Sequence, residues 1–135
     1  MTVGQAWQET LRSEYAAGYG YGIVGGRLGP ADDAATAAIA DHRSRRDYCI
    51  DQLTALGIEP EPGAAAYEPP TAVRTEQEAR DLAAAIEQGA SATYLGLVGQ
   101  ADAAARRTGV RWLQQSSLLQ AHWTGKIPAL PGMAG

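Results

Sequence analysis

Two charged side chains interrupt the apolar face of an Ala-rich helical segment in the first half of the chain. Across residues 31–56, the inward positions of a heptad pattern fall in order at Ala35, Ile39, His42, Arg46, Cys49, Leu53 and Leu56. A histidine and an arginine at inward positions are strongly destabilising if they are buried without partners. The rest of the chain must therefore supply polar or acidic groups that face His42 and Arg46.

Hydrophobic periodicity predicts four helices, over residues 4–28, 31–56, 76–100 and 102–124. The first carries an acid, Glu14, on its inward face, and the third carries Glu87 beside its inward stripe. Residues 1–124 are long enough for one domain with a core of its own. The remaining residues, 125–135, are rich in Gly and Pro and are expected to form an irregular tail.

The connection between the second and third helices is long and contains four prolines. Its 18 residues, 57–74, can reach about 55–60 Å when extended, whereas a helix of 26 residues is about 39 Å long. This connection can therefore cross the whole length of a bundle, while the other two connections are short. The short–long–short pattern predicts an all-α, antiparallel four-helix bundle with one long Pro-rich crossover.

This topology brings polar residues of all four helices to one height in the middle of the bundle. Counting outward from the first turn places Glu14 level with Arg46, to within about one helical turn. The predicted polar layer, or ligand pocket, consists of Glu14, Tyr15, His42, Arg46, Glu87, Gln114 and Gln115.

With these features the chain resembles the ferritin-like superfamily, and more narrowly a bacterial ferritin-like family of unknown function. The residues that carry the resemblance are Glu14, Tyr15, Tyr19, Tyr21, His42, Arg43, Arg45, Arg46, Asp47, Glu87 and Tyr94. The resemblance implies the fold and brings no established activity. Metal-binding ferritin-like proteins use a Glu-x-x-His motif on two helices. Here Ile39 stands three residues before His42, and Leu119 stands three residues before His122. No dinuclear metal cofactor is therefore expected.

Three interpretations of the polar layer follow. The favoured one is a non-catalytic protein with a structural or binding role, in which Arg46 replaces metal ions as the counter-charge of the glutamates. A second is a pocket in which His42 and Arg46 hold a small anionic ligand, with glycines of the first helix leaving room. The third is an iron- or manganese-dependent oxidoreductase with Glu14, His42 and Glu87 as ligands.

Other notable residues have simpler interpretations. Arg43 and Arg45, flanked by two aspartates, are expected on a solvated helix face. Cys49 is expected to be a small buried group, and the tyrosines are expected to supply bulk between small residues. None of these predictions points to a catalytic group.

Composition limits the partners and the compartment. The net charge is −4 and the pI is about 5.1, which does not favour nucleic acid as a partner. No apolar run is long enough to span a membrane, and the first residues do not resemble a signal peptide. A single cysteine fits a reducing, cytoplasmic setting. An Ala-rich chain without Phe is expected to bury its remaining apolar surface in a homodimer.

Overall fold

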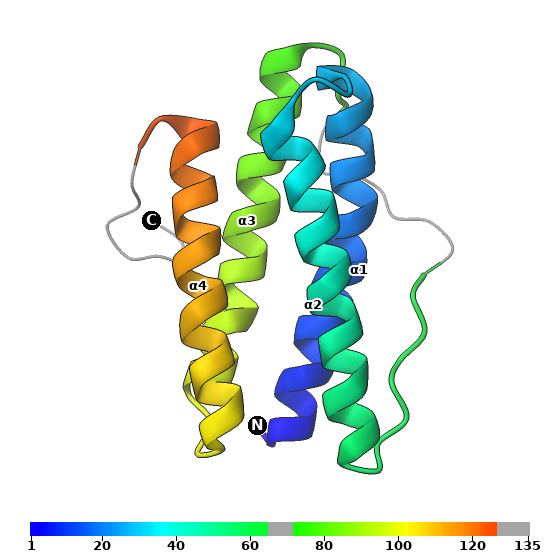
Figure 1. Ribbon diagram of the computed structural model, residues 1–135, viewed down its shortest axis with the longest axis vertical. Coiled ribbons are helices and arrows are strands. Elements are labelled where there is room, and N and C mark those ends of the chain that lie inside the picture. Colours follow the sequence, from blue (N-terminus) through cyan, green and yellow to red (C-terminus); the bar gives the residue numbers. More distant parts are fainter. Residues whose placement is uncertain (65–71, 127–135) are drawn as a thin grey trace.

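The computed structural model describes residues 1–64 and 72–126, and this part of the chain forms four α-helices and no strand. The helices are α1 (Val3–Leu28), α2 (Asp33–Ala55), α3 (Glu76–Val98) and α4 (Ala103–Thr124). In Figure 1 α1 and α2 form one antiparallel hairpin, and α3 and α4 form another. The predicted all-α four-helix bundle is confirmed. Part of the crossover, residues 65–71, and most of the expected tail, residues 127–135, lie outside the described residues.

Each helix begins at a side chain that accepts a hydrogen bond from the first turn. These N-cap residues are Thr2, Asp32, Thr75 and Asp102. At α3 the Thr75 side chain accepts from the Glu78 backbone N–H at 3.0 Å. The Glu78 carboxylate accepts from the backbone N–H of Arg74, the residue before the N-cap, at 3.1 Å. The short polar caps therefore account for where the helices start.

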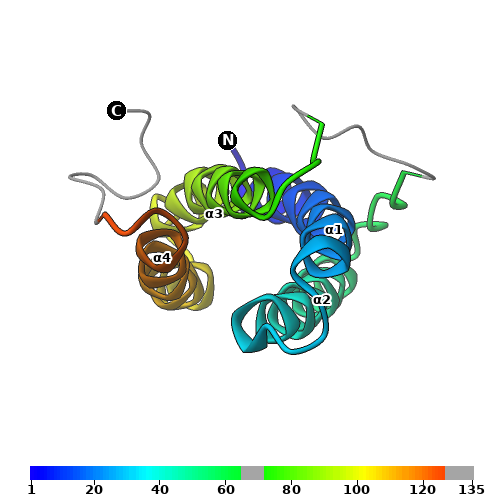
Figure 2. The same cartoon turned by 90° about the horizontal axis from the view of Figure 1, so that it is seen from above.

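The four helices lie side by side in an arc, in the order α4, α3, α1, α2, when the molecule is viewed from above (Figure 2). Gly109 allows α4 to approach α3 closely. A Cβ atom at this position would lie 2.8 Å from the carbonyl oxygen of Tyr94 and 2.9 Å from Cβ of Leu97. Helices α1 and α3 therefore form the middle of the arc, and α2 and α4 form its two ends.

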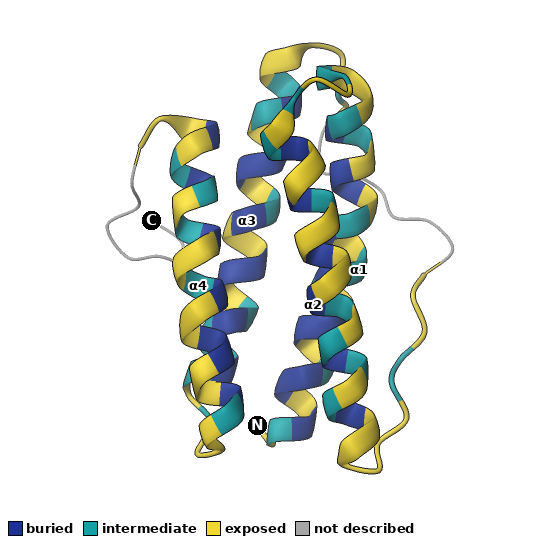
Figure 3. Cartoon of the chain, in the orientation of Figure 1, coloured by how far each residue is buried: buried dark blue, intermediate teal, exposed yellow. Residues whose placement is uncertain are grey.

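The apolar core is divided into two clusters. One lies near the start of α1 and includes Trp7, Leu11, Leu53, Leu97 and Trp112. The other lies near the end of α1 and includes Tyr21, Val24, Ala38, Leu82 and Trp123. Figure 3 shows that buried positions continue along the helices between the two clusters. Several of these positions are occupied by polar side chains, and these form the layer described below.

Within residues 1–64 and 72–126, no helix combines the length and the apolar character needed to cross a lipid bilayer.

Candidate functional site

A histidine from α2 lies between two glutamates from the central helices α1 and α3. Nδ1 of His42 lies 2.6 Å from Oε2 of Glu14, and Nε2 of His42 lies 2.9 Å from Oε2 of Glu87. The exposed fractions of Glu14 and His42 are 1%, and Glu87 is fully buried. Both ring nitrogens of His42 are therefore occupied by carboxylate oxygens of the same chain.

The two carboxylates keep His42 protonated. Burial lowers the pKa of His42, but the hydrogen bonds and negative charges of Glu14 and Glu87 outweigh it and raise the pKa to about 9. Burial raises the pKa of Glu87, but the hydrogen bond and charge of His42 outweigh it, and the pKa lies below its usual value. At neutral pH, both nitrogens of an imidazolium ring therefore donate to the glutamates.

Two tyrosines cross between the central helices. Tyr21 follows Glu14 on α1 by seven residues and donates a short hydrogen bond to Glu87 on α3. Tyr94 follows Glu87 by seven residues and donates a short hydrogen bond to Glu14. Burial and the neighbouring carboxylate raise the pKa of each tyrosine. The tyrosines therefore stay protonated, and α1 and α3 exchange equivalent Tyr–Glu hydrogen bonds.

The last carboxylate oxygen is satisfied from α4. The hydroxyl of Ser116 donates to Oε1 of Glu87 at 2.5 Å. From the same helix, Nε1 of Trp123 donates to the hydroxyl of Tyr21 at 3.1 Å. Because the hydroxyl of Tyr94 donates to Oε1 of Glu14, every carboxylate oxygen of the two glutamates lies against a hydrogen-bond donor of the protein. The hydrogen-bonding capacity of these buried acids is therefore met within the chain.

A second buried cation, Arg45, completes the layer. Its Nη1 atom donates to the hydroxyl of Tyr94, and its Nη2 atom donates to Oε1 of Gln115, both at 2.9 Å. The guanidinium also lies 5.4 Å from the ring centre of Tyr94 and 5.7 Å from that of Trp112. Burial lowers the pKa of Arg45, but Tyr94 and the two glutamates outweigh it and raise the pKa. Two cations therefore match the two carboxylates.

The prediction that Arg46 faces inward is wrong, and so is the prediction that Arg45 lies on a solvated face. The Arg46 side chain is 34% exposed and pairs with Asp47 at 3.0 Å. The buried stripe of α2 consists of Ala35, Ala38, His42, Arg45, Cys49 and Leu53. The sequence-based stripe placed Ile39 inward where the structure buries Ala38, and the same stripe placed Arg46 inward where the structure buries Arg45. Leu56, also assigned inward, is 48% exposed.

The other predicted residues are divided between the layer and the surface. Gln115 reaches the layer through its bond with Arg45, whereas Gln114 is exposed on the outer side of α4. Tyr15 is half-buried and packs against the apolar cluster near the start of α1. Glu14 meets His42, one turn away from the predicted pairing with Arg46.

The predicted set did not include Tyr21, Tyr94 and Ser116. Tyr21 stands seven residues before Leu28, and Ser116 stands four residues after Trp112, so helical spacing indicates an inward position for both. For Tyr94 the available signal was its spacing of seven residues from Glu87, which repeats the spacing from Glu14 to Tyr21. The repeated Glu–Tyr spacing of seven residues therefore indicates both tyrosines.

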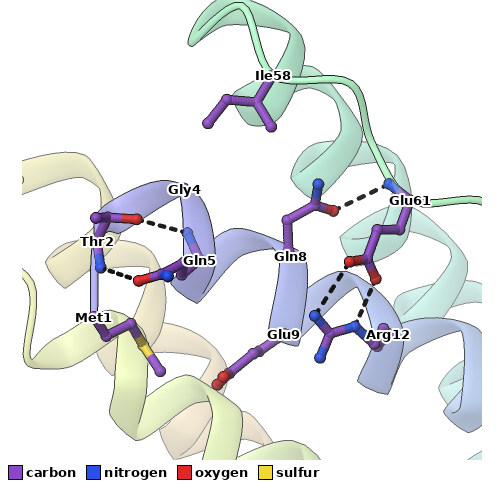
Figure 4. A pocket seen from close by; sticks show the side chains of 9 residues that line it. All are labelled: Met1, Thr2, Gly4, Gln5, Gln8, Glu9, Arg12, Ile58 and Glu61. Atoms are coloured by element: carbon purple, nitrogen blue, oxygen red, sulfur yellow. Dashed lines mark hydrogen bonds and ion pairs between the residues drawn. The ribbon is translucent and has the colours of Figure 1, made fainter.

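A separate surface pocket of about 530 Å³ lies where α1 meets the start of the crossover (Figure 4). The amide of Gln8 donates to the carbonyl oxygen of Glu59 at 2.9 Å and accepts from the backbone N–H of Glu61 at 3.1 Å. Arg12 forms two hydrogen bonds with the Glu61 carboxylate, the shorter at 2.6 Å. These side chains attach the crossover to α1, so much of the pocket's polar lining serves a structural contact.

Comparisons with known proteins agree with this architecture. Residues 6–135 match the family described as "Domain of unknown function (DUF4439)". The structure is similar to that of Rv2844, a conserved hypothetical protein from Mycobacterium tuberculosis, with 30% identity and a TM-score of 0.87. The similarity covers 91% of this chain and 95% of the other. A search of curated proteins gave no match. The chain therefore belongs to the DUF4439 family.

Proposed function

We propose that this protein is a non-catalytic, metal-free bundle of the ferritin-like type, in which the buried layer is structural. The observation that carries the proposal is that all four carboxylate oxygens of Glu14 and Glu87 face donors from the chain itself. A buried polar network with every member satisfied stabilises one arrangement of its helices, because other arrangements leave charges unpaired. The layer thus fixes the heights of α1, α2 and α3 relative to one another. Any binding role then belongs to residues on the surface of the bundle.

The alternative is an iron- or manganese-dependent oxidoreductase, and the donor set does not fit a dinuclear centre. A metal-bound histidine uses one nitrogen for the metal and the other for a second partner. Both nitrogens of His42 instead contact the two glutamates that would be ligands. Arg45 adds a buried cation to the same layer, which opposes the binding of divalent ions.

The small-anion alternative requires His42 and Arg46 to share a pocket, and they do not. His42 is enclosed by Glu14, Glu87 and the stacked ring of Tyr21, whose centre lies 5.4 Å away. Arg46 extends toward Asp47 at the surface. We therefore favour the structural role.

Elemental analysis of the natively purified protein tests the proposal, with thermal unfolding before and after chelation as a second readout. The expected result is iron and manganese far below one ion per chain and a melting temperature that the chelator does not change. The variants His42→Ala and His122→Ala form a matched pair, since His122 is exposed. Near-stoichiometric metal that is lost only in His42→Ala would overturn the proposal.

A further inference from the structure

Helix α2 carries an exposed stripe of small and acidic residues at heptad spacing. The stripe consists of Asp33, Ala37, Ala40, Ser44, Asp47 and Asp51, all of them exposed. Successive members are four and three residues apart, so they share one side of the helix. This side lies opposite the buried stripe that contains His42.

Helix α4 carries a second exposed stripe, with long and basic residues at the same spacing. It consists of Arg107, Arg111, Gln114 and Leu118, and Leu118 is 72% exposed. A surface hollow of about 440 Å³ adjoins it and is lined in part by Arg107, Val110 and Arg111. Among the residues that the structure describes, neither Arg107 nor Arg111 forms an ion pair. Helix α4 contains three arginines and no acidic residue, although the whole chain has a net charge of −4.

The two stripes lie on the two end helices of the arc (Figure 2). Figure 3 looks onto these helices, and much of the surface that α2 and α4 present to the viewer is exposed. The hydrogen bonds from Arg45 to Gln115 and from Thr108 to Tyr48 fix the heights of α2 and α4 relative to each other.

At that register four positions of the α2 stripe are level with complementary positions of α4. Because the helices run in opposite directions, the number of one residue rises as that of the other falls. The level pairs are Asp51 with Arg107, Asp47 with Arg111, Ser44 with Gln114, and Ala40 with Leu118. In sequence order along the helices, acid meets base, polar meets polar, and a small residue meets an exposed leucine.

We propose that a second copy of this chain docks on this face, with α2 of each copy packed against α4 of the other. A twofold axis parallel to the helices keeps the heights unchanged, so every level pair becomes an intermolecular contact and occurs twice. Antiparallel helices with matched heptad stripes pack knobs into holes, and Ala40 and Ser44 leave room for Leu118. The charge pairs select this partner and this register. The inference is independent of the role assigned to the buried layer.

The mass of the wild-type protein under native conditions is the first test, by native mass spectrometry and sedimentation equilibrium. The expected result is a dimer at micromolar concentration whose dissociation constant rises with salt, because exposed ion pairs are screened. A protein that remains monomeric at about 100 μM overturns the proposal, whether or not an acidic partner protein binds the same arginines.

Two charge-reversal variants then test the pairing. Arg107→Asp with Arg111→Asp makes both stripes acidic, and Asp47→Arg with Asp51→Arg makes both stripes basic. Each variant alone is expected to weaken the dimer at least about tenfold, because like charges face each other. An equimolar mixture is expected to form a heterodimer, which native mass spectrometry distinguishes by mass. Failure of the mixture to associate overturns the proposed pairing.

The control variant is Arg27→Asp with Arg74→Asp, which reverses two exposed charges away from α2 and α4. It is expected to dimerise like the wild type. Circular dichroism melting of every variant confirms that each is folded. A dimer that survives both charge reversals, or that the control abolishes equally, overturns the assignment of this face.

Discussion

Nδ1 of His42 lies 2.6 Å from Oε2 of Glu14, with both side chains buried. The opposite oxygen of Glu14 accepts from Tyr94, whose hydroxyl in turn accepts from Arg45. Glu14 thus connects the two buried cations of the layer. Because charges in a low-dielectric interior interact strongly, the effect of removing one of them depends on what remains unpaired.

Glu14→Ala is expected to lower the free energy of unfolding by about 3–5 kcal/mol, the range for breaking a buried ion pair. The loss arises because His42 and Arg45 remain buried with only one carboxylate. Urea denaturation measures the change. Glu9→Ala, which removes an exposed glutamate of the same helix, is the control and is expected to change stability by less than about 0.5 kcal/mol. Equal effects of the two substitutions would contradict the buried-charge argument.

The stability of the fold is expected to fall between about pH 6.5 and pH 9. His42 has a pKa of about 9 in the folded state, compared with 6.5 for a free histidine. Its contribution is fully present below the unfolded value and is lost as the pH rises through the folded value. The loss is on the order of 3 kcal/mol, from the linkage relation. The Glu87 pKa is lowered, so its contribution is present above 4.5 and is lost only as the pH falls below that value.

Urea midpoints at several pH values measure this slope. An NMR titration of the ring protons checks its origin. The chain contains only two histidines, so in His122→Gln the remaining histidine ring signals belong to His42. A midpoint that is constant from pH 6.5 to 9, or a His42 resonance that titrates near 6.5, would contradict the prediction.

Arg45→Met and Arg46→Met distinguish the observed register of α2 from the one read from the sequence. Arg45→Met is expected to destabilise the protein by about 2 kcal/mol, because Tyr94 and Gln115 lose a charged donor. Arg46→Met is expected to change stability by less than about 1 kcal/mol, since its ion pair with Asp47 is at the surface. Thermal melting of the two variants side by side measures the difference. A larger loss of stability in Arg46→Met than in Arg45→Met would mean that Arg46 is the buried arginine, as the sequence pattern predicted.

The fold could be predicted because its signals act over long stretches. The prolines between residues 57 and 74 exclude a continuous helix, and the segment's length permits a crossover. Helix periodicity and polar caps then define four helices, and the lengths of their connections leave few topologies, one of which is the observed bundle. A prediction that places a helical residue one position off its true face does not change the topology.

The site could be predicted only in part, because it depends on such single-residue differences. Glu14, His42 and Glu87 were found because each lies at an inward height that the topology fixes. Arg45 was missed because Ala38 and Ile39 both suit an apolar face, and either choice gives a regular stripe. Whether Ala38 or Ile39 is buried depends on how closely α2 approaches α1, which is a property of the tertiary structure. The two helices are close where Ile39 faces Gly25 of α1, because a Cβ atom at Gly25 would lie 3.4 Å from Cδ1 of Ile39.

The attachment of the crossover to α1 depends on Gln8. Its amide satisfies the carbonyl of Glu59 and the N–H of Glu61. Gln8→Ala is expected to increase hydrogen exchange of the Glu61 amide at least about tenfold while lowering global stability by less than about 1 kcal/mol. Arg12→Ala is the matched comparison, because it removes the side-chain ion pair with Glu61 and leaves the backbone bonds intact. Equal exchange in the two variants would contradict the role of the Gln8 amide.

Gly109 and Gly89 are both helical glycines, and alanine is expected to have opposite effects at the two sites. A Cβ atom at Gly109 would lie within 3.0 Å of backbone atoms of α3, which cannot move aside without separating α3 from α4. Gly109→Ala is therefore expected to destabilise the protein by about 2–3 kcal/mol. At Gly89 a Cβ atom would meet nothing within 4 Å, so Gly89→Ala is expected to stabilise by about 0.5–1 kcal/mol through helix propensity. Denaturant titrations of both variants measure the difference. Stabilisation by Gly109→Ala would mean that α3 and α4 lie further apart than the structure places them.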